Sequence, residues 1–453
     1  MKVVKFGGSS LASGEQIQKV YNIVVSDSKR KMVVVSAPGK RYSDDCKVTD
    51  LLIACAEGYL EDGEAPDLFE AVIERYSSIA RELNLSANIV EKIHDDLLTL
   101  LQADKCNPEQ FLDVIKASGE DNHAKLIAAY FRHQGVEAHY VNPKEAGLFV
   151  SNEPGNAQVL PDSYQRLYSL RERSGILIFP GFFGYNEQGE VVTFSRSGSD
   201  ISGAILANGI KAELYENFTD VNAVYSVNPT IVQNPKEIRE LTYREMRELS
   251  YAGFSVFHEE ALIPAFRAGI PVNVKNTNNP SALGTRIVNE RDNTNGPVIG
   301  IASDQGFCSI YVSKYLMNRE VGFGRKLLHI LERNGLSYEH TPSGIDDISI
   351  ILRQNQMDHL LEKEIIDQIK RELHADEVKV EHNLALIMVV GKGMRHNIGT
   401  MAKASAALER ARVNIEMINQ GSSEVSMMFG VKEEDEKRAV QAIYEEFFVG
   451  VVV

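Results

Sequence analysis

The sequence has 453 residues, 43% of them hydrophobic, and this length predicts two or three domains because a single hydrophobic core stops growing at about 250 to 300 residues. The formal net charge of -15 disfavours nucleic acid as the main partner, so any anion site must be a local concentration of positive charge. The four cysteines form no Cys-x-x-Cys pair and no uncharged apolar run approaches the roughly 20 residues of a membrane helix, so we expect a cytoplasmic protein without a zinc site, disulfides or a membrane span.

The first predicted element is a short apolar strand that begins at Lys2 and carries Lys5 near its end. Gly7 and Gly8 follow it, and glycines let a backbone approach an anion and point successive N–H groups at it. Apolar residues at helical spacing then predict a helix whose N-terminus faces the same place: Ile17, Val20, Tyr21 and Val24. The pattern predicts a phosphate site, and the alternative is a tight turn beside a solvated lysine.

The segment Lys-Phe-Gly-Gly-Ser-Ser at residues 5–10 resembles the N-terminal signature of the aspartokinases, a family within the amino acid kinase superfamily. The resemblance implies an α/β fold over residues 1–290, with a largely parallel sheet between helices. It also assigns four residues to the phosphates of ATP: Lys5, Gly7, Gly8 and Ser9. A P-loop pattern is absent, and Gly391-Lys-Gly393 lacks the third glycine of a dinucleotide fingerprint.

Strand and helix patterns alternate up to about Asn289, which predicts a parallel sheet covered on both faces. Besides the first, strands are expected at 32–36, 137–141, 176–179, 212–218 and 270–274. Residues 67–117 carry helical patterns with few strand signals, so we expect a helical lid or satellite subdomain there. The polar, turn-rich run 289–297 predicts a linker.

Ser36-Ala-Pro-Gly39 ends the second apolar strand, where α/β sheets collect ligands, although an ordinary strand-to-loop turn has the same composition. Together with Thr49-Asp-Leu-Leu52 it resembles the aspartokinase segment that contacts aspartate. The resemblance implies that Ser36 and Thr49 bind the substrate. This chain inserts residues 40–47 between the two parts.

Glu120 follows a glycine and precedes a helical pattern at 124–131. A carboxylate at this place can be a favourable charge at the N-terminus of a helix. The Gly-Glu pair is also similar to the family's glutamate that holds the ammonium group of the substrate. We expect the second role.

The loop Phe194-Ser-Arg-Ser-Gly-Ser-Asp200 resembles the Gly-Arg-Gly-Gly-Ser-Asp loop of aspartokinases, with two serines in place of two glycines. Arg196 offers a planar fork suited to a bidentate grip on a carboxylate. The resemblance implies that Arg196 and Ser199 bind the substrate. Asp200 is expected to cap the next helix and, as a catalytic residue, to orient Lys5 or a hydrated Mg²⁺.

Asn217-Phe-Thr-Asp220 closes another strand and, with Tyr225, resembles the nucleotide loop of the family. The resemblance implies that Thr219 and Asp220 hold the adenosine end of ATP and that Tyr225 packs against it.

Two positions depart from the commoner family pattern. Thr230 stands where an arginine often follows the proline, and Ser255 stands where a lysine often precedes His258, which we expect to be structural. The phosphate contacts of these cations are expected to come from the inserted loop instead: Lys40, Arg41 or Lys47.

The C-terminal part contains an internal repeat with a constant offset of 77 residues, as when Leu331-Glu-Arg333 recurs as Leu408-Glu-Arg410. The two copies, 298–381 and 382–453, each predict the ferredoxin-like order strand, helix, strand, strand, helix, strand, with the third element of the first copy at 337–341. The second copy resembles the C-terminal ACT module of aspartokinases. The alternative is a purely structural αβ sandwich.

The resemblance to ACT modules implies feedback by an end-product amino acid. It assigns effector binding to residues of the first copy: Met317, Gly322, Phe323, Ser337 and Glu339. Lysine is the expected effector, with threonine or both together left open. A homodimer or a dimer of dimers through these modules is implied as well.

The resemblance further implies ATP-dependent phosphorylation of the β-carboxylate of L-aspartate to 4-phospho-L-aspartate, the first step of lysine, threonine and methionine biosynthesis and of the diaminopimelate pathway. ATP is the co-substrate, and Mg²⁺ is expected only as the ion bound to it. The aspartate side chain is already an anion near neutral pH, so no general base is required. Two alternatives stay open: another phosphotransferase of the superfamily, or a catalytically weak amino acid sensor.

Overall fold

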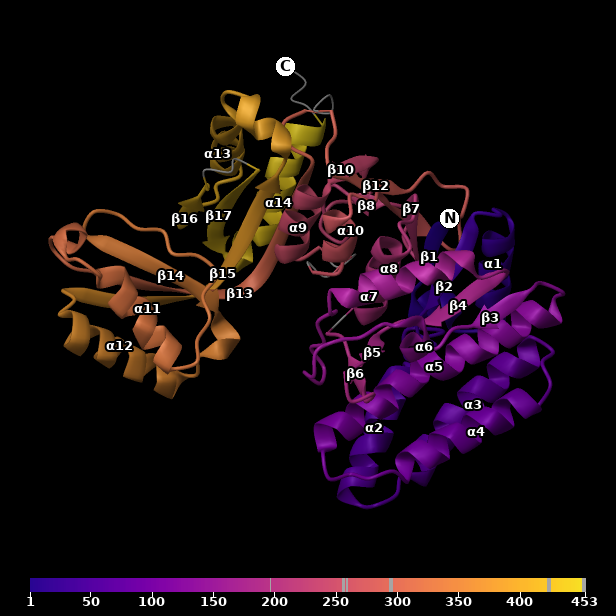
Figure 1. Ribbon diagram of the computed structural model, residues 1–453. Coiled ribbons are helices and arrows are strands. Elements are labelled where there is room, and N and C mark those ends of the chain that lie inside the picture. The colour runs from indigo at the N-terminus through magenta and orange to yellow at the C-terminus, as the bar shows by residue number, and fades with distance from the viewer. Residues whose placement is uncertain (196, 255–256, 258–259, 293–295, 422–424, 450–453) are drawn as a thin grey trace. The chain divides into compact units, whose positions relative to one another are not determined.

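The computed structural model describes residues 1–195, 197–254, 257, 260–292, 296–421 and 425–449. The chain forms two compact units (Figure 1). The first comprises Met1–Val224, Glu237–Arg247 and Ser255–Arg291, and the second comprises Tyr225–Lys236, Glu248–Phe254 and Asp292–Val453. Two short segments of the N-terminal part of the sequence therefore belong to the second unit.

One eight-stranded sheet forms the centre of the first unit, in the order β10-β12-β11-β7-β1-β2-β4-β3. Its strands are β1 (Lys2–Phe6), β2 (Arg30–Val35), β3 (Ala138–Tyr140), β4 (Ile176–Pro180), β7 (Leu214–Thr219), β10 (Glu240–Thr242), β11 (Val272–Asn276) and β12 (Thr285–Val288). The run from β11 to β3 is parallel throughout, whereas β12 is antiparallel to β11. The largely parallel sheet is confirmed, with each expected strand within two residues of its place.

Two pairs of short strands accompany this sheet: β5 (Phe183–Tyr185) with β6 (Val191–Thr193), and β8 (Val224–Tyr225) with β9 (Glu237–Ile238). The helices before residue 292 are α1 (Gly14–Val25), α2 (Val48–Glu61), α3 (Pro66–Glu82), α4 (Asn88–Leu101), α5 (Pro108–His133), α6 (Pro143–Ala146), α7 (Asp162–Leu167), α8 (Gly198–Gly209), α9 (Tyr243–Tyr251) and α10 (Ile263–Arg267), with the 3₁₀ turns η1 (Gly8–Leu11) and η2 (Tyr168–Glu172).

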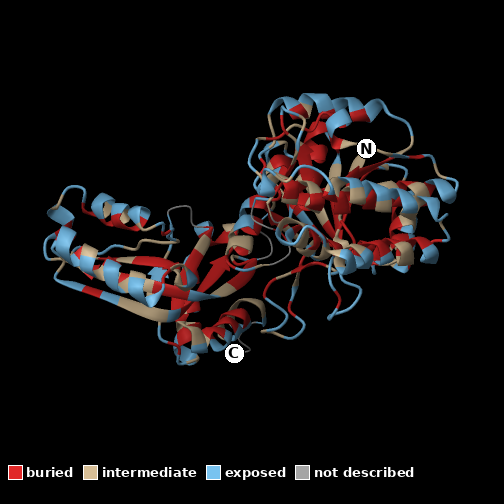
Figure 2. Ribbon diagram, turned by 90° about the horizontal axis from the view of Figure 1, so that it is seen from below, coloured by how far each residue is buried: buried red, intermediate tan, exposed pale blue. Residues whose placement is uncertain are grey.

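Helices cover both faces of the sheet, and the buried residues gather along the strands and the inner faces of the helices (Figure 2). On one face, Val4 and Phe6 of β1 pack into a core with α1, α3 and α5. Because successive side chains of a strand alternate, Lys5 points to the other face, where α8 packs against β1 and β7. The sequence favours this arrangement because β-branched runs such as Val33–Val35 suit strands buried on both sides.

The expected run of helices is confirmed as α3, α4 and the first part of α5. These helices share one hydrophobic core with β1 and α1, so they belong to the first unit and do not form a separate lid or satellite subdomain. The expectation that a helix begins after Glu120 is wrong, because α5 is continuous from Pro108. Its start is fixed by two ordinary signals: the Asn107 side chain accepts the Gln110 N–H at 3.3 Å, and proline occupies the first turn. Glu120 therefore lies in the middle of a long helix.

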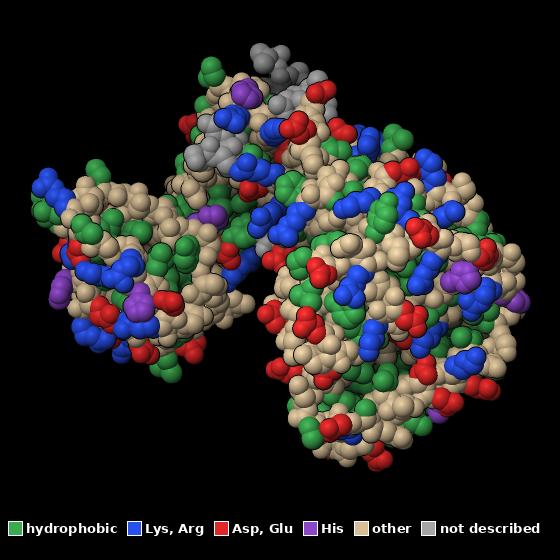
Figure 3. Space-filling model, in the orientation of Figure 1, with side chains coloured by type: hydrophobic (Ala, Val, Ile, Leu, Met, Phe, Trp, Pro, Cys, Tyr) green, Lys and Arg blue, Asp and Glu red, His purple; other side chains and the backbone are tan. Residues whose placement is uncertain are grey.

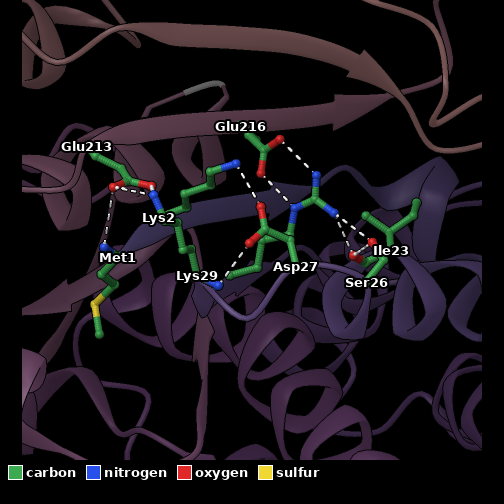
Figure 4. Close-up of polar contacts among 9 residues, drawn as sticks. Met1, Lys2, Ile23, Ser26, Asp27, Lys29, Glu213 and Glu216 are labelled. Carbon is green, nitrogen blue, oxygen red and sulfur yellow. Dashed lines mark hydrogen bonds and ion pairs between the residues drawn. The ribbon is translucent and has the colours of Figure 1, made fainter.

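Ion pairs tie together the amino-terminal ends of β1, β2 and β7 (Figure 4). Lys2 Nζ lies 2.8 Å from Asp27 Oδ2, and the Arg30 guanidinium grips Glu216 with both Nε and Nη2, at 2.7 and 2.9 Å. Arg30 Nη1 also donates to Ile23 O at the end of α1, at 2.6 Å. Charged side chains therefore occupy this end of the sheet and join β1, β2 and β7.

The second unit is built on one antiparallel five-stranded sheet in the order β14-β13-β15-β17-β16. Its strands are β13 (Gly300–Ser313), β14 (Asp347–Arg353), β15 (Glu377–Val390), β16 (Met417–Asn419) and β17 (Ser426–Lys432). Its helices are α11 (Phe323–Arg333), α12 (His359–Leu373), α13 (Thr400–Arg410) and α14 (Glu436–Tyr444), with the short turns η3 (Met317–Arg319), η4 (Gln354–Gln356), η5 (Lys392–His396), η6 (Glu433–Asp435) and η7 (Glu445–Val449).

The two repeat copies share strands. The first part of β13, Gly300–Asp304, pairs with the second half of β15, whereas the last part of β13 pairs with the first half of β15 and with β14. The module limits 298–381 and 382–453 therefore remain predictions from the sequence repeat. In the structure, β15 extends across residue 381 and β13 is hydrogen-bonded to both of its halves. The expected strand at 337–341 is wrong, since only His340 forms a bridge there, with Ile351.

Among the described residues, no helix is long and apolar enough to cross a membrane. On the face shown in Figure 3, basic and acidic side chains are interspersed over the first unit.

Candidate active site

Several predicted site residues follow the carboxyl ends of the central parallel strands. Because these strands run in one direction, their carboxyl ends meet at one edge of the sheet, where α/β folds collect ligands. The glycine pair follows β1, Ser36 follows β2, and Asp220 follows β7. The fold thus brings together segments that lie far apart in the sequence.

Lys5 is held in place inside this edge. Its side chain is 9% exposed, and its Nζ lies 2.6 Å from Oδ1 of Asp200 on α8. The same carboxylate oxygen accepts a hydrogen bond from Asn217 Nδ2 at 2.5 Å, and Asn217 is the register partner of Lys5 on β7. The alternative of a solvated surface lysine is wrong, since this ammonium is buried and oriented by a carboxylate.

The glycine pair lies in close backbone contact with the loop after β2. The Gly39 N–H donates to Gly8 O at 2.9 Å, and a Cβ on Gly8 would stand 3.1 Å from Ala37 O. The Gly7 N–H donates to Phe218 O at 3.1 Å, which continues the pairing of β1 with β7. The expectation that the Gly7 N–H points at a phosphate is therefore wrong, and the N–H groups of Gly8 and Ser9 stay candidates.

The N-terminus of α1 is also used differently from expectation. The 3₁₀ turn η1 follows the glycines, and α1 begins only at Gly14, whose N–H donates to Glu82 Oε2 at 2.7 Å. The Ser13 side chain accepts the Gln16 N–H at 3.4 Å. The first N–H groups of the helix thus serve protein side chains instead of a bound anion.

Ser36 and Thr49 flank the inserted loop. Ser36 is half-buried at the end of β2, and Thr49 is half-buried in the first turn of α2. The Ser36 carbonyl accepts a hydrogen bond from His123 Nδ1 at 2.8 Å. Burial lowers the pKa of His123 to about 4, so the ring is neutral at physiological pH and carries its proton on Nδ1. The sequence pattern around His123 predicts no role for this residue.

Glu120 is a buried carboxyl group without full hydrogen bonding. It is 5% exposed, and its Oε2 has no hydrogen-bond partner among the described residues. Burial raises its pKa to about 8, while a hydrogen bond from the Ala37 backbone and the charge of Lys5 act in the opposite direction. A buried acceptor of this kind suits a cationic ligand group, which would supply the missing hydrogen bond. The helix-terminus alternative is wrong, because Glu120 lies in mid-helix.

The loop before α8 is described except at Arg196, which lies outside the described residues. Ser197 has a φ of 62°, a left-handed conformation that glycine adopts without strain and a serine adopts less easily. The Asp200 N–H donates to Ser197 O at 2.8 Å, and the Ser199 side chain is buried against Gly181 at the end of β4. These contacts fix Ser199 and Asp200 at the first turn of α8.

The expected nucleotide residues begin at the end of β7. Thr219 Oγ1 donates to Asp220 Oδ1 at 3.1 Å, and the Thr219 carbonyl accepts the Thr277 N–H at 2.9 Å. Tyr225 is half-buried at the end of β8. The structure fixes the backbone of Thr219 against the residue that follows β11.

The cations expected to replace the missing arginine and lysine are partly engaged. Arg41 donates both Nε and Nη2 to Asp45 at 2.9 Å, and Lys40 Nζ reaches Ser43 O at 3.2 Å within the same loop. Thr230 hydrogen-bonds to Asn228. Ser255 and His258 lie outside the described residues.

The expected effector residues lie around the start of α11 in the second unit. Met317 and Phe323 are buried, and Gly322 takes a φ of 82° as it leads into the helix. Ser337 donates to Gln356 Oε1 through its N–H and its hydroxyl, at 3.0 and 2.9 Å.

Glu339 is already partnered. It accepts a hydrogen bond from Tyr251 OH, and its Oε1 lies 3.7 Å from Arg353 Nε. An amino acid effector that used this carboxylate would have to compete with Tyr251.

Three residues that sequence analysis did not single out shape the site: Asn217, His123 and Arg75. The sequence does point to Asn217, because it is the first residue of the motif Asn217-Phe-Thr-Asp220; in the sheet it pairs with Lys5. His123 follows Glu120 by three residues on α5, which is one helical turn. Arg75 offers no such signal, because it meets the loop after β2 only through tertiary structure.

Comparison with known proteins agrees with this geometry. Residues 1–276 match the amino acid kinase family, and residues 387–447 match the ACT domain. The chain is 74% identical to aspartokinase 3 of Bacillus subtilis (strain 168), with 100% of both chains covered.

Three solved structures, from two enzymes, are similar over 99% of the chain. Clostridium acetobutylicum aspartate kinase gives a TM-score of 0.88 at 39% identity, covering 99% of this chain and 100% of that one. E. coli aspartokinase III in complex with aspartate and ADP gives 0.79 at 27% identity, covering 99% and 100%. The same enzyme in complex with lysine and aspartate gives 0.79 at 26% identity, covering 99% of each chain.

Proposed function

The chain belongs to the amino acid kinase family and, within it, to the aspartokinases, and from this premise we propose that it uses ATP to phosphorylate the β-carboxylate of L-aspartate, giving 4-phospho-L-aspartate. The observation that carries the residue assignment is the buried Lys5–Asp200 pair beside the glycine loop. The positive charge of Lys5 also acts to lower the pKa of the Glu120 carboxyl group.

Lys5 stabilises the transferring phosphoryl group. Phosphoryl transfer spreads negative charge over the transferred oxygens, so catalysis is mostly positioning and electrostatic stabilisation. Asp200 and Asn217 hold the Lys5 ammonium before substrate arrives, at 2.6 Å from the carboxylate. The N–H groups of Gly8 and Ser9 point further partial positive charge at the same phosphate. No group needs to remove a proton, because the acceptor carboxylate is already ionised.

The substrate is gripped at both ends of its amino acid portion. The Glu120 carboxylate binds the ammonium group, which satisfies its unpartnered Oε2, and Arg196 binds the α-carboxylate. Ser36, Thr49 and Ser199 complete the pocket. These contacts aim the side-chain carboxylate at the γ-phosphate.

ATP enters with its adenosine end at Thr219, Asp220 and Tyr225. A nucleotide-bound Mg²⁺ fits this site better than a resident ion: Asp200 offers one carboxylate, and Mg²⁺ in kinases is typically held by one or two carboxylates together with phosphates and water. Among the described residues no group of three or more metal-ligating side chains occurs. When bound, the ion neutralises charge on the phosphates.

The second unit supplies regulation by an amino acid. The ACT match supports this assignment, and the lysine complex of the E. coli relative makes lysine the first effector to test, alone or with threonine. A homodimer or dimer of dimers through these modules, a place in lysine and threonine biosynthesis, and a cytoplasmic location complete the proposal. The four free cysteines suit a reducing compartment.

An acyl phosphate assay tests the function. Hydroxylamine trapping should yield a hydroxamate only when ATP and L-aspartate are both present, and lysine, threonine or the pair should reduce the rate. A panel of other carboxylate, phosphate and carbamate acceptors should turn over poorly. Preference for another acceptor would make the chain a different phosphotransferase of the superfamily, and amino acid binding without any turnover would make it a sensor.

A further inference from the structure

Arg75 on α3 is a buried cation that the reaction above does not use. It is 5% exposed, and its Nη1 lies 2.8 Å from Asp45 Oδ2 in the inserted loop. Asp45 also accepts hydrogen bonds from Arg41: from the backbone N–H at 2.8 Å, and from the side-chain Nε and Nη2 at 2.9 Å each. Hydrogen bonds from Arg41 and then from Arg75 hold the pKa of Asp45 well below its usual range. A charged cluster thus fixes loop 40–47 to α3.

The same guanidinium grips the backbone at the end of β2. Arg75 Nη2 donates to Gly39 O and, at 3.4 Å, to Cys46 O. The N–H of Gly39 donates in turn to Gly8 O at 2.9 Å, and a Cβ on Gly39 would overlap the Gly8 carbonyl carbon. Gly39 therefore connects Arg75 to Gly8, the second residue after β1.

We propose that Arg75 and Asp45 are positioning residues for phosphoryl transfer: they hold Gly39 against Gly8 and so fix the Gly8 and Ser9 N–H groups where the transferring phosphate binds. This inference rests on the proposed function, which assigns Gly8 to the phosphate. Arg75 touches neither substrate and acts only through Gly39.

The geometry requires an arginine. Its planar fork carries several N–H groups, so one nitrogen meets the Asp45 carboxylate while the other meets a carbonyl. A lysine has one compact ammonium and cannot span both. A buried ion pair by itself contributes little stability compared with apolar residues of similar size. If the cluster has a positioning role, that role depends on the contact between Arg75 and Gly39 O, and not on the ion pair with Asp45.

Three variants separate these roles in the full-length enzyme, with kcat, the KM values of aspartate and ATP, and thermal stability measured for each. Arg75→Lys keeps the ion pair but loses the Gly39 contact, so we expect near-normal stability with kcat at least tenfold lower, because small misplacements of reacting groups can cost up to about 10²-fold. Arg75→Met alone leaves Asp45 buried without this partner and should lose both stability and activity.

The double variant Arg75→Met/Asp45→Asn removes both charges and should regain stability while kcat stays at least tenfold low. Arg81→Met is the matched control, since Arg81 lies on the same helix in an exposed pair with Glu74 and should leave all parameters unchanged. Recovery of kcat together with stability in the double variant would overturn the proposal, as would near-normal kcat in Arg75→Lys. A wild-type enzyme inactive with ATP and aspartate would instead reject the proposed function.

Discussion

At Lys5 a positive charge is held in place before any substrate arrives. The ammonium is buried, and Asp200, itself fixed by Asn217, sets its direction. Such preorganised charge is more effective in a site shielded from water than in solution, because nothing has to rearrange when negative charge develops. Lys5 is therefore the residue whose removal should affect the chemical step most.

Lys5→Ala should lower kcat by about 10²- to 10³-fold, the usual loss for one preorganised donor, with smaller changes in the KM of aspartate. Steady-state kinetics of acyl phosphate formation measures this. Lys2→Ala is the control on the same strand, since Lys2 pairs with Asp27 at the opposite end of β1. A Lys5→Ala enzyme that retained near-normal kcat would refute the role of this ammonium.

The ionised form of Glu120 that the proposed aspartate binding requires is the form that lowers the stability of the fold. Its folded-state pKa, raised to about 8 by burial, exceeds the ordinary value of 4.5, so the folded protein holds this proton more tightly than the unfolded chain does. Stability from this group is therefore present at low pH and is lost as pH rises from about 4.5 to about 8. The proposed role of Glu120 in aspartate binding, in contrast, requires its ionised form, which would meet the substrate ammonium.

Glu120→Gln should consequently unfold at a higher temperature than the wild type, by a margin that grows between pH 4.5 and pH 8 and then levels off. The same variant should raise the KM of aspartate strongly. In the wild type, the KM of aspartate should fall as pH rises from 6.5 to 8.5. Thermal scans from pH 4.5 to pH 8.5 and kinetics from pH 6.5 to pH 8.5 test the two expectations. An equal Tm difference at every pH would show that the pKa of Glu120 is the same in the folded and unfolded states.

At the scale of elements, the two ends of the parallel sheet have different tasks. The amino-terminal end is tied by charged side chains, as Figure 4 shows, whereas the carboxyl-terminal end carries the glycine loop, Ser36 and Thr219. The Arg30–Glu216 pair is buried, with side chains 11% and 4% exposed. It joins β2 to β7 across β1, and the Arg30 guanidinium also lies over the Phe218 ring, 5.5 Å from its centroid.

Arg30→Met should destabilise the first unit by about 3 to 5 kcal/mol, because it leaves the Glu216 charge buried without its partner. Lys29→Ala removes an exposed pair with Glu213 and should cost less than about 1 kcal/mol. Urea unfolding followed by circular dichroism measures both. At temperatures where Arg30→Met stays folded its kcat should equal that of the wild type, and a large loss of kcat would contradict the separation of the two ends.

At the scale of the whole molecule, the two regulatory copies form a single structural unit. β15 extends across the limit between the two copies and β13 pairs with both of its halves, so neither copy has a sheet of its own. Helix α9 contributes Tyr243–Arg247 to the first unit and Glu248–Tyr251 to the second. Tyr251 donates to Glu339, an expected effector ligand, so a segment from the N-terminal part of the sequence contacts the effector region.

Tyr251→Phe should therefore strengthen effector binding. A hydrogen bond to a charged group contributes about 1.5 to 3 kcal/mol, and its loss frees Glu339 for the ammonium group of the effector. We expect half-inhibition by lysine, or by lysine with threonine, at a concentration at least tenfold lower. Inhibition curves and binding calorimetry with and without aspartate test this, since coupling between the two ligands must be reciprocal. Unchanged or weaker inhibition would show that Glu339 does not bind the effector.

Much of the fold follows from local sequence pattern. Apolar runs such as Val33–Val35 predict strands, and their alternation with helical spacing predicts a parallel sheet with ligands at its carboxyl end. The failures have a local cause as well: the capping signal Asn107-Pro108 moves the start of α5 ahead of Glu120. The glycine motif predicted that the Gly7 N–H binds a phosphate, but this N–H donates to Phe218 O and continues the strand pairing.

Spacing along the chain predicts six of the eight strands of the central sheet, the repeat, the glycine loop and the residue types that can bind a phosphate and an amino acid. The pairing of Lys5 with Asp200, the contact of Arg75 with Gly39 and the Glu120 Oε2 without a partner among the described residues are seen only in the folded chain. Hydrogen bonding and desolvation depend on which atoms meet in space, and these atoms come from residues tens to hundreds of positions apart.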